Sequence, residues 1–137
     1  MPHCFVMESP KGSGGNERLL LAVVDDDESV RESLPDLLRE FGFAARAFSS
    51  GEEFLSSGCV DETRCLILDI AMPGISGPEL YQELKRRGYA IPVVFITGQR
   101  DESVRARVVK LGAAGFVLKP FSDATLLAAI NTAMQAT

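Results

Sequence analysis

Four apolar runs of this chain each end on a polar residue of a particular kind. The runs span residues 19–24, 65–68, 93–96 and 116–118, and the residues after them are Asp25 and Asp26, Asp69, Thr97 and Lys119. If the runs are parallel strands of one sheet, their carboxyl ends meet at a single edge. That edge would gather carboxylates, a hydroxyl and an ammonium, which together suit a divalent cation and a phosphoryl group.

Strand-like and helix-like patterns alternate along the chain. Apolar strand-like runs cover residues 19–24, 44–48, 65–69, 93–96 and 115–118, and helical periodicity covers residues 30–41, 51–57, 77–87, 102–111 and 123–134. Five strands alternating with five helices predict an α/β fold whose parallel sheet is covered by helices on both faces. The second run contains Arg46, which predicts that it forms an edge strand.

The ends of the predicted helices carry the expected capping residues, with one conflict. Ser76 and Glu79 have the spacing of a capping box before the third helix. Pro35 falls inside the first helix, where it removes one backbone hydrogen bond and crowds the carbonyl of Arg31. We therefore expect a kink there, or a helix that begins later than Glu28.

Size and composition narrow the class of protein. A chain of 137 residues is one domain by size, and we expect a flexible leader over residues 1–17 and the folded domain over residues 18–137. The net charge of -5 argues against direct binding of nucleic acid by this chain. The chain has no apolar run long enough for a membrane span. Three cysteines without the spacing of a disulfide framework favour a cytoplasmic location.

The acidic residues at the first run have two readings. Asp25, Asp26, Asp27 and Glu28 are consecutive, and such a turn can simply favour the start of the following helix. Carboxylates that meet Asp69 at the sheet edge can instead hold Mg²⁺, which takes few protein ligands and accepts phosphate oxygens. We expect Asp25 and Asp26 to be ligands and Asp27 and Glu28 to cap the helix.

The other three strand ends fit a phosphoryl group. Asp69 can act as a carboxylate nucleophile and form an acyl phosphate. Thr97 can donate a hydrogen bond to a phosphoryl oxygen, and the ammonium of Lys119 can bind it as a point charge. Each residue alone has a simpler explanation, such as a turn cap, a β-former or a solvent-facing lysine. The four endings together, in one α/β pattern, indicate phosphoryl chemistry.

At this point the chain closely resembles the receiver domain of two-component response regulators. The resemblance covers residues 19–133 and rests on four motifs: Val24-Asp25-Asp26, Asp69-Ile70-Ala71-Met72-Pro73 with Ser76-Gly77, Thr97-Gly98, and Lys119-Pro120-Phe121. Within the family it is most similar to the FixJ/NodW-like subgroup. The resemblance implies a flavodoxin-like, CheY-like sheet with strand order 2-1-3-4-5.

The resemblance also implies a role for each strand end. Asp69 would be the phosphoacceptor, and Mg²⁺ would be held by Asp25, Asp26, Asp69 and the backbone carbonyl of Ala71. Thr97 and Lys119 would contact the phosphoryl group, and the Lys119–Pro120 peptide would be cis. Thr97 and Phe116 would form the switch, with the hydroxyl moving towards the phosphoryl group and the ring packing into the vacated space.

Partners follow from the same resemblance. A sensor histidine kinase or a histidine phosphotransfer protein would donate the phosphoryl group, docking near Ser29, Val30, Ser33 and Phe121. The surface of the fourth helix, fifth strand and fifth helix would carry output contacts or a homodimer formed on phosphorylation. The output would be transcription, through a DNA-binding domain absent from this chain. The alternative is a stand-alone receiver that acts in a phosphorelay or by protein contact.

Two other functions use the same residue types. A Mg²⁺-dependent phosphohydrolase would use Asp69 as nucleophile, but it usually needs a general acid at position 71, where this chain has alanine. A flavin- or nucleotide-binding module would need a glycine-rich loop after the first strand, where this chain has Asp25 to Glu28. We therefore expect a phosphorylated switch that catalyses only its own phosphorylation and slow dephosphorylation.

Overall fold

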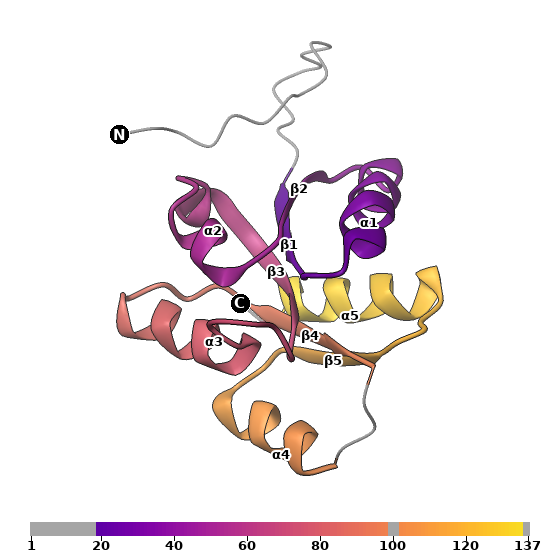
Figure 1. Ribbon diagram of the computed structural model, residues 1–137. Coiled ribbons are helices and arrows are strands. Elements are labelled where there is room, and N and C mark those ends of the chain that lie inside the picture. Colours follow the sequence, from indigo (N-terminus) through magenta and orange to yellow (C-terminus); the bar gives the residue numbers. More distant parts are fainter. Residues whose placement is uncertain (1–18, 99–101, 136–137) are drawn as a thin grey trace.

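The computed structural model describes residues 19–98 and 102–135. Figure 1 shows one sheet in the middle of the molecule with helices on both sides. The elements in chain order are β1 (Leu20–Val24), α1 (Glu28–Glu40), β2 (Ala44–Phe48), α2 (Gly51–Leu55), the 3₁₀ turn η2 (Val60–Glu62), β3 (Thr63–Asp69), α3 (Gly77–Arg86), β4 (Val93–Thr97), α4 (Glu102–Leu111), β5 (Gly115–Leu118) and α5 (Asp123–Gln135). The predicted alternation of five strands and five helices is confirmed.

The sheet has the order β2-β1-β3-β4-β5, and every pairing is parallel. The predicted order and the edge position of β2 are therefore correct. The register places Asp69 beside Ile96 and Thr97 beside Leu118. The strands consequently end level with one another, which brings the polar residues that follow them to one edge of the sheet.

Alternate residues of each strand face opposite sides, and each side has its own core. One core contains Val24, Leu68 and Phe95 and is covered by α2, α3 and α4. The other contains Val23 and Ile96 and is covered by α1 and α5. Figure 1 shows the same division, with α1 and α5 on one side of the sheet and α2, α3 and α4 on the other. Both faces are thus buried, as the uninterrupted apolar runs require.

The sequence predicts that the first helix either kinks at Pro35 or begins later than Glu28. The helix begins at Glu28 and continues through Pro35, so the later start is wrong. Asp27 makes the early start possible because its side chain accepts a hydrogen bond from the N–H of Ser29 and caps the helix. Pro35 itself is buried, so its ring packs in the interior. The loss of one backbone bond is tolerated where the helix face is well packed.

The third helix has the capping box expected from the sequence. Ser76 accepts from the N–H of Glu79, and the Glu79 carboxylate accepts from the N–H of Ser76. This fixes the start of α3 directly after the loop that follows Asp69. Among the residues that the structure describes, no helix has the length and apolar character needed to cross a membrane.

Candidate functional site

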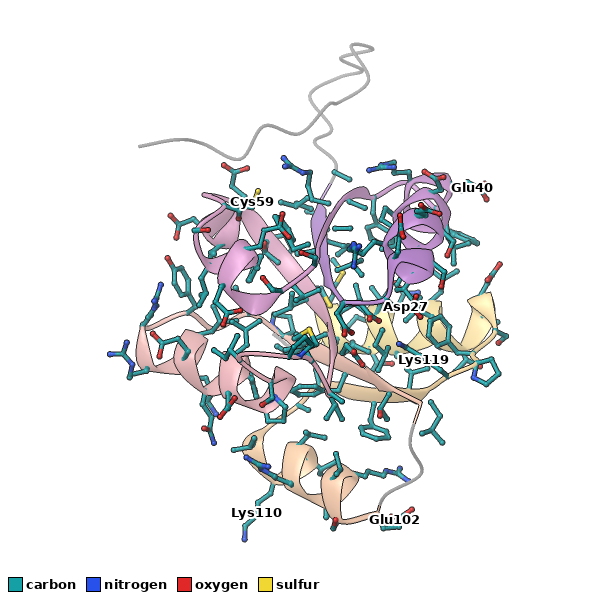
Figure 2. All side chains as sticks on the ribbon, in the orientation of Figure 1. Asp27, Glu40, Cys59, Glu102, Lys110 and Lys119 are labelled. Atoms are coloured by element: carbon teal, nitrogen blue, oxygen red, sulfur yellow. The ribbon has the colours of Figure 1, made fainter. Side chains whose placement is uncertain are left out.

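The four strand ends come together at the carboxyl edge of the sheet, as predicted. Asp25, Asp69 and Thr97 are buried, and Lys119 is half-buried. Lys119 reaches this edge because its N–H donates to the carbonyl of Thr97 at 2.8 Å, directly after β5. Figure 2 labels Lys119 next to Asp27, which lies in the loop between β1 and α1. Loops from opposite ends of the sequence therefore build one site.

Three carboxylates of this site can act together as ligands. Asp25, Asp26 and Asp69 each offer an oxygen, and these oxygens lie within 4.8 Å of one another. Asp26 is exposed while Asp25 and Asp69 are buried, so the cluster opens to solvent on one side. Oxygen ligands with an open side suit Mg²⁺, which keeps several waters and accepts phosphate oxygens. The donor set therefore fits the cation expected from the sequence.

The ammonium of Lys119 lies between the two buried carboxylates. Its Nζ is 2.9 Å from Oδ2 of Asp25 and 3.9 Å from Oδ1 of Asp69. Burial alone would lower the pKa of Lys119, but the hydrogen bond to Asp25 and the charges of Asp69 and Asp25 outweigh it and raise that pKa. Lys119 is thus held charged and close to the carboxylate of Asp69.

The surroundings of Asp69 perturb the ionisation of its carboxyl group. Burial is the main cause, and the neighbouring Asp25 carboxylate adds to it, so the pKa of Asp69 is raised to about 7. The charge of Lys119 acts in the opposite direction but does not cancel these effects. A group that neutralises this excess of negative charge, such as a divalent cation, would favour the ionised, nucleophilic carboxylate.

Asp25 is held by hydrogen bonds at every polar group. Its N–H donates to the carbonyl of Phe48 at 3.1 Å, and its Oδ1 accepts from the N–H of Asp27 at 2.9 Å. Its carbonyl accepts from Nη1 of Arg31 at 3.0 Å. Sequence reasoning assigned Asp25 as a ligand but did not identify Arg31, which looked like an ordinary residue of the polar helix face.

The two switch residues lie on the same face of the sheet. Phe116 pairs with Phe95 in the register, and Thr97 lies two residues further along β4. Phe116 is half-buried, and the guanidinium of Arg105 from α4 lies 5.8 Å from the centre of its ring. Phe116 therefore lies between the end of β4 that carries Thr97 and the side chain of Arg105 from α4.

The loop after Asp69 has tight contacts that the sequence did not reveal. A Cβ added at Gly77 would collide with the carbonyl oxygen of Asp69, so the start of α3 lies directly against the backbone of Asp69. Glu52 of α2 accepts a hydrogen bond from the N–H of Ile75 at 3.2 Å. Only the glycine of the Ser76-Gly77 motif gave a signal for this packing.

The remaining predicted residues lie around the site. Ala71 is exposed in the loop two residues beyond Asp69. The expected docking residues differ in exposure: Ser29 and Ser33 are exposed, while Val30 and Phe121 are half-buried at the margin of the core under α1 and α5. The Lys119–Pro120 peptide is cis, as the resemblance implied.

Fold and site together define a class: a doubly wound parallel α/β domain with a cluster of carboxylates and a lysine at the carboxyl edge of its sheet. The sequence matches the response regulator receiver domain family over residues 21–131. The chain belongs to this family. Receiver domains are in general not enzymes with a separate substrate; they generally bind Mg²⁺ and interact with histidine kinases.

Individual relatives agree with the subgroup expected from the sequence. The chain is 42% identical over 118 residues to the transcriptional regulatory protein FixJ of Azorhizobium caulinodans, covering 86% of this chain and 56% of the relative. It is 41% identical over 129 residues to nodulation protein W of Bradyrhizobium diazoefficiens, covering 91% of this chain and 57% of the relative. The crystal structure of FixJ-N superimposes with a TM-score of 0.79 at 35% identity, covering 89% of this chain and 98% of the other. The chain thus spans just over half the length of the curated relatives.

Proposed function

We propose that this domain is a phosphorylated switch whose phosphoacceptor is Asp69. The observation that carries the proposal is the arrangement of Lys119 between the buried carboxylates of Asp25 and Asp69. Burying such charged groups costs free energy, and buried ionisable groups that perturb one another cluster at functional sites. Asp69 is the carboxylate best placed to be modified, because it ends the central strand β3.

In the proposed reaction, an oxygen of Asp69 attacks the phosphorus of a phosphohistidine in a histidine kinase or a histidine phosphotransfer protein. The new O–P bond forms an acyl phosphate while the P–N bond breaks, and its electron pair leaves with the imidazole nitrogen. Asp25, Asp26, Asp69 and the carbonyl of Ala71 hold Mg²⁺. When bound, this cation neutralises charge on the carboxylates and on the transferred phosphoryl oxygens.

The chain's own residues then read the modification. Lys119 moves from its bond with Asp25 towards the phosphoryl group and pairs with it. The hydroxyl of Thr97 donates to a phosphoryl oxygen, and Phe116 turns into the space that Thr97 leaves. Because Phe116 lies beneath Arg105, this movement alters the surface of α4, β5 and α5. The change is a shift between two populations of one fold.

The same proposal covers partners and location. The kinase docks around Ser29, Val30, Ser33 and Phe121, next to the site. The α4, β5 and α5 surface forms a homodimer on phosphorylation or contacts an output. Since FixJ is named as a transcriptional regulatory protein, we propose a transcriptional output through a DNA-binding domain outside this chain. The receiver domain itself does not bind nucleic acid directly. The domain acts in the cytoplasm.

The direct test is phosphorylation by a small donor. The protein is incubated with acetyl phosphate and Mg²⁺, and its intact mass is measured. We expect one phosphoryl adduct in the native protein and in Asp36→Asn, which changes an exposed carboxylate of α1. Asp69→Asn should give none. An adduct that persists in Asp69→Asn, or its absence from the native protein, would overturn the proposal.

A further inference from the structure

Arg31 of α1 contacts the acidic site through its side chain. Its side chain is half-buried, and Nη1 donates a hydrogen bond to the carbonyl oxygen of Asp25 at 3.0 Å. Its backbone N–H donates to the carbonyl of Asp27 at 3.2 Å. Arg31 therefore binds the residues on both sides of Asp26.

The residues on both sides of Asp26 are also held by other bonds: the N–H of Asp25 donates to the carbonyl of Phe48, and the side chain of Asp27 accepts from Ser29. Asp26 lies between β1 and α1, outside any regular element, and its side chain is exposed. The conformation of this turn also depends on the Asp27 N–H bond to Oδ1 of Asp25 and on the contacts of Arg31. A guanidinium is planar with several fixed donors, so it can hold a carbonyl in one direction better than a flexible amine can.

We propose that Arg31 is a positioning residue of the cation site: through the carbonyl of Asp25 it fixes the turn that presents the carboxylates of Asp25 and Asp26. The inference rests on the proposed function, in which these two residues hold Mg²⁺. Residues that orient metal ligands without touching the metal typically change metal affinity by about 10- to 100-fold when they are replaced.

Charge and geometry predict opposite effects of removing Arg31. A fixed positive charge near a cation site repels the cation, so removing the charge alone would strengthen Mg²⁺ binding. Loss of the hydrogen bond to Asp25 would instead loosen the turn and weaken binding. The direction of the change in affinity therefore distinguishes a positioning role from an electrostatic one.

The same helix provides a matched control. Nη2 of Arg39 donates to the carbonyl of Ala45 at 2.9 Å, so Arg39 also joins α1 to a strand through a backbone carbonyl six residues away. This bond lies at the start of β2, whereas the carboxylates of the site follow the ends of the strands. Arg39→Gln removes the same kind of bond and the same charge from the same helix, without touching the turn at Asp26.

The first measurement is the dissociation constant for Mg²⁺ by isothermal titration calorimetry. For Arg31→Gln we expect binding about 10-fold weaker than in the native protein, with Arg39→Gln within about twofold. Arg31→Lys retains the charge and one donor and should fall between the native protein and Arg31→Gln. If Arg31→Gln does not fold, the Mg²⁺ affinity of Arg31→Lys tests the proposal in its place.

The second measurement needs no metal. In the presence of a chelator, the amide of Asp27 should exchange its hydrogen faster in Arg31→Gln than in the native protein, because its acceptor, Oδ1 of Asp25, is no longer held in place. Arg39→Gln should leave that exchange rate unchanged.

The outcomes separate the two proposals. If the native protein does not bind Mg²⁺, the proposed function fails and the inference fails with it. If the native protein binds Mg²⁺ but Arg31→Gln binds equally well or more tightly, the inference alone is wrong. An equal loss of affinity in Arg31→Gln and Arg39→Gln would also overturn it, since the effect would then be general to α1.

Discussion

Helices α3 and α4 cover the same face of the sheet and each has ten residues, but they are held very differently. α3 begins with a capping box and buries five residues: Gly77, Pro78, Leu80, Tyr81 and Leu84. Within the described part of α4, Val108 is the single buried residue, and Val109 is 56% exposed. Burial of apolar surface is the main source of stability, so one helix is fixed and the other is weakly attached.

The weakly attached helix is secured mainly at its C-terminal end. The hydroxyl of Tyr81 in α3 donates to the carbonyl of Gly112 at 2.9 Å, and Nζ of Lys85 donates to the carbonyl of Leu111 at 2.9 Å. A cation at this end also interacts favourably with the helix dipole. These bonds join the C-terminal end of α4 to α3, while Arg105 nearer its N-terminal end lies over the ring of Phe116 at 5.8 Å.

The largest expected difference comes from removing a leucine at the end of each helix. Leu84→Ala in α3 should lower the free energy of unfolding by about 3 kcal/mol, because Leu84 is fully buried and a cavity remains. Leu111→Ala in α4 should lower it by about 1 kcal/mol, since Leu111 is half-buried. Urea denaturation of both variants measures the difference. Equal losses would show that α4 is packed as firmly as α3.

A second comparison concerns Gly77 and Gly98, which follow the strands β3 and β4 that end at Asp69 and Thr97. Gly77→Ala forces a methyl group against the carbonyl of Asp69 and should lower the free energy of unfolding by about 2 kcal/mol. It should also reduce phosphorylation by acetyl phosphate, because Asp69 must shift. Gly98→Ala meets no atom within 4 Å and should change stability by less than about 0.5 kcal/mol. A stable Gly77→Ala protein with full phosphorylation would contradict the close packing of α3 against the site.

A third prediction concerns the charge of Asp69, the residue that leads into α3. The pKa of Asp69 is raised in the folded state, mainly by burial. Folding therefore favours the protonated carboxyl over the ionised carboxylate. The folded state then binds more protons than the unfolded state, so this contribution to stability is present at low pH and is lost as pH rises through about 7.

Asp69→Asn removes this penalty. In the presence of a chelator, the free energy of unfolding of the variant should exceed that of the native protein by about 1–2 kcal/mol at pH 8. The difference should shrink towards pH 4. Thermal unfolding across this range measures it. A difference that does not depend on pH would show that burial does not disfavour the charge of Asp69.

The smallest expected effect tests the link between the two helices. Tyr81→Phe removes the hydroxyl that donates to Gly112 and should lower the free energy of unfolding by about 1 kcal/mol. Amide hydrogens near Ala113 should then exchange faster, while those in the first turn of α3 should not change. Tyr89→Phe is the control, because the hydroxyl of Tyr89 hydrogen-bonds to the exposed Asp61. Unchanged exchange in Tyr81→Phe would rule out this link.

Some of the site could be read from the sequence and some could not. Asp25, Asp69, Thr97 and Lys119 were identifiable because each follows an apolar run, and parallel strands align their carboxyl ends. The helix boundaries followed from periodicity and caps, apart from the start of α1. There Pro35 suggested a later start, and packing of its ring in the interior outweighed the lost backbone bond.

The sequence by itself determined the α/β alternation, the two-sided burial of the sheet and the set of polar residues at its edge, because these depend on local periodicity and on the chemistry of single residues. Only the tertiary structure decided that Lys119 pairs more closely with Asp25 than with Asp69, that Arg31 donates to the carbonyl of Asp25, and that Tyr81 reaches Gly112. The last of these contacts joins residues 31 positions apart, and the pair of Lys119 and Asp25 joins residues 94 positions apart. No local pattern encodes such pairs, because their geometry is set by how the packed helices and strands place their ends.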